Sequence, residues 1–87
     1  MHAVVIKATI TDRDALPTEL SDLVPIVSDA PGFVAGYWIL LGQNQGIPIL
    51  LFDSEDRASI QALETQVAGS DAAKIDSVEV GDVRARA

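Results

Sequence analysis

Two stretches in the middle of the chain carry no charge and show no alternation between polar and apolar residues. They span Phe33–Leu41 and residues 47–52, and both are rich in aliphatic and aromatic side chains, which is typical of strands. An antiparallel sheet usually packs one face on a core and exposes the other to water, so its strands alternate. Because neither parity is polar here, we expect both faces of this sheet to be covered.

Two further segments are predicted to complete the sheet. Residues 3–9 are rich in β-branched side chains with Lys7 as the only charge, and residues 74–85 form the last strand. In that last strand Gly81 breaks the alternation, which predicts a bulge. Pro48 has no N–H to donate to a ladder, so we place it at the start of its strand or at a bulge.

A helix is predicted between the first two strands. Pro17 suits the first turn of this helix, where its missing N–H costs nothing. Pro25 predicts a kink or a change of axis, and the helix should end by Asp29. The apolar stripe at helical spacing consists of Leu16, Leu20, Leu23, Val24 and Val27.

A second helix is predicted over residues 55–67. Asp53 or Ser54 is its N-cap, and the carboxylates that follow favour the positive end of the helix dipole. Its apolar stripe, which should face the core, consists of Ile60, Leu63 and Val67, with Ala58 and Ala62 beside them.

The predicted order is therefore β-α-β-β-α-β within one domain that covers residues 1–87. With right-handed crossovers, each β-α-β unit leaves a gap that another strand fills. The result is an α+β, ferredoxin-like fold, in which a four-stranded antiparallel sheet of order 4-1-3-2 carries both helices on one face. The other face would be an apolar patch larger than monomers tolerate, so we expect a two-fold homodimer that buries it.

Composition excludes several classes of function. The net charge is −7 and the six cations form no basic stripe, which argues against nucleic acid and anionic membranes as partners. There is no cysteine for a disulfide, a zinc-thiolate site or a thiol nucleophile, and a single histidine argues against a His-rich metal site. No apolar run is long enough for a transmembrane helix or a signal peptide, so we expect a soluble, cytoplasmic protein without a metal.

The order of elements and two short stretches resemble a known family. Residues 31–38 read Pro-Gly-Phe-Val-Ala-Gly-Tyr-Trp and residues 52–55 read Phe-Asp-Ser-Glu. Together they resemble the dimeric α/β-barrel superfamily, and within it the antibiotic-biosynthesis-monooxygenase-type domains, over nearly the whole chain. The resemblance implies a homodimer with a pocket between the sheet and the helices of each subunit.

Active members of this family oxidise phenolic or quinol-like substrates with O₂ and no bound cofactor, and other members degrade haem. They tend to rely on Asn, Trp, Tyr or His in the pocket. This chain departs from that pattern, because its first strand has no Asn and its second helix lacks the His that haem-degrading members need. The resemblance therefore implies no bound cofactor, and it carries over no complete catalytic set.

Two adjacent aromatic residues are the leading site candidates. Trp38 and Tyr37 point to opposite faces of their strand, so only one of them can line a given pocket. Gly36 shares the parity of Trp38 and leaves space beside the indole. The candidate substrate-binding residues are Trp38, Gly36, Phe52 and Leu50, and the candidate catalytic residues are Trp38, Tyr37 and His2.

Each candidate also has a structural interpretation. Trp38 can be a core or dimer-interface residue, and Tyr37 can be an interface or rim residue. His2 is the only side chain with an ordinary pKa near neutrality, but it lies next to the chain terminus and can be a surface residue.

The sequence leaves three functions open. The first is a small cofactor-independent monooxygenase-like enzyme that acts on an aromatic or quinol-type molecule. The second is a non-catalytic dimeric module that binds a hydrophobic metabolite, such as a small aromatic ligand. The third is a structural dimer with a filled interior. Fold alone does not decide between them.

Overall fold

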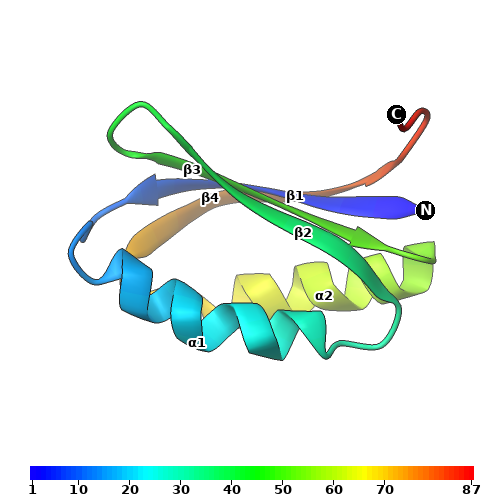
Figure 1. Ribbon diagram of the computed structural model, residues 1–87, viewed down its shortest axis with the longest axis horizontal. Helices are drawn as coiled ribbons and strands as arrows, with labels where there is room; N and C mark the ends of the chain where they lie inside the picture. Colours follow the sequence, from blue (N-terminus) through cyan, green and yellow to red (C-terminus); the bar gives the residue numbers. More distant parts are fainter.

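Four strands form one antiparallel sheet, and two helices cover one of its faces (Figure 1). The computed structural model describes residues 1–87, and its strand order is β2-β3-β1-β4, which is 4-1-3-2 read from the other edge. The predicted ferredoxin-like fold is confirmed. The elements are β1 (His2–Ile10), α1 (Leu16–Ser28), β2 (Phe33–Leu41), β3 (Gln45–Phe52), α2 (Glu55–Ala68) and β4 (Ala73–Asp82).

Pro48 lies inside strand β3, neither at its start nor at a shift of register, which corrects both alternatives of the sequence prediction. It pairs with Trp38 of β2. On the other side, the ladder between β3 and β1 has no paired residues between Val5 and Ala8, which is where Pro48 lies. A proline has no N–H to donate, so the sheet accepts Pro48 by interrupting one of its two ladders.

The bulges do not lie at Gly81, where the sequence predicted one. Gly81 pairs regularly with Ala3. The register of β4 shifts instead opposite Lys7 and Ala8, so that Asp76 is the extra residue, and a second shift in β2 leaves Val34 unpaired. The prediction failed because β4 ends at Asp82, so Val83 lies outside the strand and its phase relative to Gly81 carries no information about a bulge.

Helix α1 continues through Pro25 and ends at Ser28, so Pro25 does not break it. The carbonyl that Pro25 leaves without a partner belongs to Ser21, which is exposed and can be hydrated. At the end of the helix the Asp29 N–H donates to the Pro25 carbonyl at 3.2 Å. The predicted end by Asp29 is confirmed.

Helix α2 presents its small residues to the sheet, and the predicted inward stripe faces water. Ile60, Leu63 and Val67 are 50%, 63% and 87% exposed. Ala58 is fully buried against the core, and Gln61 is 9% exposed. Small side chains allow a helix backbone to approach the sheet closely, and this packing overrides the apolar period of the sequence. The predicted N-cap is confirmed, since the Ser54 hydroxyl accepts from the Arg57 N–H at 3.3 Å.

The core lies between the sheet and the helices. The rings of Phe33 and Phe52 meet edge to face, with centroids 5.8 Å apart and an interplanar angle of 76°. These two residues pair across β2 and β3, so their packing fixes that end of the sheet. The buried core cluster consists of Val4, Ile6, Val27, Leu50, Phe52 and Ala58.

The face of the sheet without helices is divided into an apolar and a polar half. Strands β2 and β3 carry the apolar half, which includes Tyr37, Ile39 and Leu41 as exposed side chains. On the other half, Thr9 of β1 donates a hydrogen bond to Asp76 of β4 at 2.7 Å. The prediction of a sheet that is apolar on both faces therefore holds for β2 and β3 only.

Candidate ligand-binding groove

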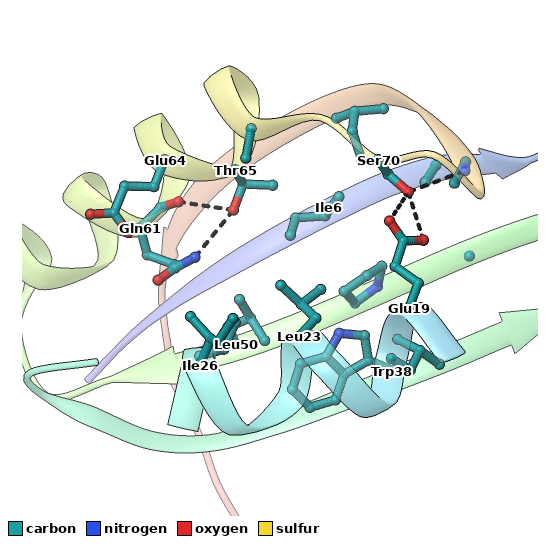
Figure 2. A pocket seen from close by; sticks show the side chains of 18 of the residues that line it. Ile6, Glu19, Leu23, Ile26, Trp38, Leu50, Gln61, Glu64, Thr65 and Ser70 are labelled. Atoms are coloured by element: carbon teal, nitrogen blue, oxygen red, sulfur yellow. Dashed lines mark hydrogen bonds between the residues drawn. The ribbon is translucent and has the colours of Figure 1, made fainter. Parts of the chain in front are cut away.

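A groove of about 470 Å³ lies between the helix-covered face of the sheet and the two helices (Figure 2). Sixteen of its twenty-six lining residues are hydrophobic. Ile6, Trp38 and Leu50 line it from the sheet, and Leu23 lines it from α1. The groove exists because α2 turns small or polar side chains inward, which leaves space that leucine side chains would fill.

Trp38 is held in the groove by the residue two positions before it. Strand alternation places Gly36 and Trp38 on the helix-covered face, opposite Leu50 and Pro48 of β3. A β-carbon at Gly36 would lie 2.9 Å from both Cη2 and Cζ3 of Trp38 and 3.2 Å from Cζ of Phe33. The absence of a side chain at Gly36 therefore leaves the space that the Trp38 indole occupies, as the sequence predicts.

One polar cluster ties α1 to the loop between α2 and β4 (Figure 2). The Ser70 hydroxyl donates to the Glu19 carboxylate, with distances of 2.7 and 2.8 Å to its two oxygens. The Asp71 N–H donates to the same carboxylate at 3.3 Å. Ser70 Oγ in turn accepts from the N–H groups of Ala72 and Ala73, each at 3.2 Å. Both Glu19 and Ser70 line the groove.

A second polar pair lies on the inner side of α2. Thr65 Oγ1 donates to the Gln61 backbone carbonyl at 2.9 Å, and the Gln61 side-chain amide donates to Thr65 Oγ1 at 3.3 Å. This arrangement fixes the amide group and leaves its carbonyl oxygen without a protein donor. Gln61 can therefore accept a hydrogen bond from a molecule in the groove.

The charges that line the groove are all negative. Glu19, Asp29 and Glu64 contribute carboxylates, and no lysine, arginine or histidine is among the lining residues. No group of three or more His, Cys, Asp or Glu side chains is arranged to hold a metal ion. The groove thus combines an apolar interior, one indole, one fixed amide and an acidic lining.

The other sequence candidates lie outside the groove. Phe52 is buried beneath it, in contact with Phe33. Tyr37 points to the opposite face of the sheet and is 57% exposed. His2 lies near the start of α2, with Nε2 3.8 Å from a Glu55 carboxylate oxygen, and its buried Nδ1 has no partner. Of the candidate residues, only Trp38 and Leu50 line the groove, and Gly36 supports them.

Sequence reasoning missed the polar lining. Glu19 shares a helix face with Leu16 and Leu23 at spacings of three and four residues, which is the one sequence signal that places it on the inner side of α1. Gln61 and Thr65 are also four residues apart on one face. The apolar stripe of α2 predicts the other side of the helix as the inner one, so the sequence does not indicate that these two residues line a groove.

Sheet, helices and groove together define a ferredoxin-like α+β domain with an apolar site between its layers. Three solved structures share this fold. MupZ from Pseudomonas fluorescens superposes with a TM-score of 0.70 at 17% identity, over 91% of this chain and 65% of MupZ. The structural-genomics protein YJCS gives 0.67 at 12%, over 95% and 98% of the two chains. A point mutant of MhuD, with two manganese protoporphyrin IX bound per active site, gives 0.64 at 17%, over 98% and 97%.

These likenesses establish the fold. The chain spans about 65% of the length of MupZ, and the identities are 12% to 17%. No protein-family model matches the sequence, and no curated protein matches it significantly. The family resemblance inferred from the sequence is therefore confirmed at the level of the fold. No helix is both long and apolar enough to cross a membrane.

Proposed function

We propose that the groove is the binding site for a small, flat, largely apolar molecule with an aromatic ring. The observation that carries this proposal is the apolar groove of about 470 Å³ with the Trp38 indole in its wall. Small-molecule sites commonly measure about 300–1,000 Å³ and combine apolar walls with a few fixed polar groups. Gln61 is such a group here, because Thr65 holds its amide in place.

A porphyrin is the ligand that the MhuD comparison suggests, but the lining of this groove does not fit one. The only histidine, His2, lies outside the groove, so no imidazole is available as an axial ligand. The groove also has no cation to pair with propionates, and its own carboxylates would repel them. We therefore derive no haem chemistry for this chain.

A homodimer is part of the proposal. The apolar half of the open sheet face exposes Tyr37 and Leu41 of β2, neither of which lines the groove. A second copy that packs on this face would bury them through a self-complementary, two-fold contact. The groove lies on the opposite side of the sheet, so each copy would keep a complete site.

Cofactor-free oxygenation is a second candidate function, favoured by the carboxylate of Glu64. This side chain lines the groove at its solvent-exposed rim and has no hydrogen-bond or ion-pair partner in the protein, so it would be the general base of such a reaction. An electron-rich ring that lost a proton would transfer an electron to O₂, combine with the resulting superoxide and form a hydroperoxide. Loss of water would then leave a carbonyl. One oxygen atom ends in the product, the other leaves as water, and the substrate supplies all the electrons.

The binding proposal is tested with 1-naphthalenemethanol as the probe. Trp38 is the only tryptophan, so one indole N–H resonance in the NMR spectrum reports on the groove. We expect a saturable shift of that resonance. Leu23→Ala should weaken binding about tenfold by removing apolar contact, whereas Leu63→Ala, the same change on the outer side of α2, should leave it unchanged.

A resonance that does not move, or equal effects of the two leucine variants, would contradict the binding proposal.

Oxygenation is tested separately by O₂ uptake with anthrone. Uptake that is absent in the wild-type protein, or unaffected by Glu64→Gln, would reject the enzyme and leave the binding module.

A further inference from the structure

We infer that the groove selects aromatic ligands that carry a positively charged amine and disfavours aromatic carboxylates. This inference rests on the proposed binding function and deepens it, because it names the charge class of the ligand.

The acidic lining comes from both helices. Glu19 lies on α1, Asp29 directly follows that helix, and Glu64 lies on α2. Glu19 accepts from Ser70, whereas Glu64 and Asp29 have no side-chain partner in the protein. Glu19 is half-buried, whereas Asp29 and Glu64 are exposed to solvent, so the negative charge lies along the rim of the groove.

None of the six cations offsets this charge within the groove. Lys7 pairs with Ser77, and Lys74 pairs with Thr9. By strand alternation both lysine side chains lie on the open face of the sheet, away from the helices. Arg13 donates to the Gln43 carbonyl at 2.9 Å, and Arg84 pairs with Asp82 at 3.4 Å. The remaining cations, Arg57 and Arg86, are also absent from the lining of the groove.

The neutral groups of the groove also suit a cation. The indole of tryptophan is the best aromatic partner for a cation, since its π-face is electron-rich. The carbonyl oxygen of Gln61 has no protein donor and can accept from an ammonium group. Indole, amide and carboxylates thus favour the same charge on the ligand.

The test compares three probes on one ring system: 1-naphthalenemethylamine, 1-naphthalenemethanol and 1-naphthoate, all at neutral pH and fixed ionic strength. Their Kd values are measured from the Trp38 indole resonance. We expect the amine to bind about tenfold more tightly than the alcohol, a difference of ~1.4 kcal/mol, and the carboxylate to bind most weakly.

Two charge-matched variants separate a local effect from the net charge of −7. Glu64→Gln should reduce the preference for the amine over the alcohol at least threefold. Glu79→Gln removes the same charge from the opposite face of the sheet, where Glu79 pairs with Val5, and should leave the preference unchanged. Thermal melts of both variants confirm that they remain folded.

The outcomes distinguish this inference from the proposed function. If all three probes bind with equal Kd, the charge selection is wrong and the groove remains a binding site. If Glu79→Gln lowers the preference as much as Glu64→Gln, net charge explains the order and the inference is overturned. If no probe shifts the indole resonance, the binding function fails and the charge selection fails with it.

Discussion

The benzene ring of the Trp38 indole occupies the space in which a side chain at position 36 would begin. A β-carbon at Gly36 would lie 2.9 Å from two atoms of that ring, closer than real side-chain carbons approach. The two residues share a face because they are two positions apart in one strand. The size of residue 36 therefore decides where the indole lies.

Gly36→Ala is expected to destabilise the protein by about 1–3 kcal/mol, the usual cost of overpacking a well-filled site. In a domain of this size, each kcal/mol lowers the melting temperature by roughly 4–8 °C. Gly81→Ala is the matched control, since a β-carbon there would meet nothing within 4 Å. The cost should shrink when Trp38 is also replaced by Ala, and an undiminished cost in that double variant would contradict the contact.

Ser70→Ala is expected to cost about 1–3 kcal/mol of stability, because it removes the only hydroxyl that donates to the Glu19 carboxylate. The free energy of unfolding is measured in urea. Ser77→Ala, in β4, removes a hydroxyl that makes no hydrogen bond in the protein and serves as the control. Equal effects of the two changes would show that the Glu19 contact contributes nothing specific.

The orientation of α2 is tested by two substitutions on opposite sides of the helix. Leu63→Gln should change the free energy of unfolding by no more than about 0.5 kcal/mol, as is usual for exposed positions. Ala58→Leu should destabilise by about 1–3 kcal/mol, because Ala58 is fully buried in the core. The reverse result would mean that the apolar stripe of α2 faces the sheet after all.

The proposed homodimer predicts a mass of twice 9.2 kDa in native mass spectrometry. Tyr37→Glu places a charge in the apolar half of the open face, outside the groove, and should yield monomers, since burying an unpaired carboxylate is costly. Ile60→Glu places the same charge on the outer side of α2 and should leave the dimer intact. A wild-type monomer would contradict the interface directly.

The strands could be predicted from the sequence because their signals are local. Alternation with a period of two places Trp38 and Tyr37 on opposite faces without knowledge of the rest of the fold, and Gly36 beside Trp38 for the same reason. The bounds were less accurate where one residue breaks the local rule. Pro48 is tolerated inside β3 because only the pairing with β1 is interrupted there, while the pairing with β2 continues. Whether a strand tolerates a proline in this way depends on the strands beside it, which the local sequence does not show.

The resemblance implies a pocket between the sheet and the helices, but the lining of the groove could not be predicted, because it depends on distances across the fold. Glu19 and Ser70 are 51 positions apart, and nothing in either local sequence indicates their contact. The α2 sequence offers an apolar side and a small polar side. Which of them faces the sheet depends on how closely the helix approaches, and Ala58 fits that approach where Leu63 does not.

Helix α2 leaves large apolar side chains in water while the space beneath it is partly open. Burying a side chain of the size of Ile60 or Leu63 would stabilise the fold by about 1.5–3 kcal/mol. The protein lacks most of this stabilisation, because both side chains are exposed. A molecule that fills the groove supplies part of it, adding ~2.7 kcal/mol at a concentration one hundred times its Kd. Under the proposed function, resistance to heat and to proteolysis then rises with occupancy, so the lifetime of the protein would follow the supply of its ligand.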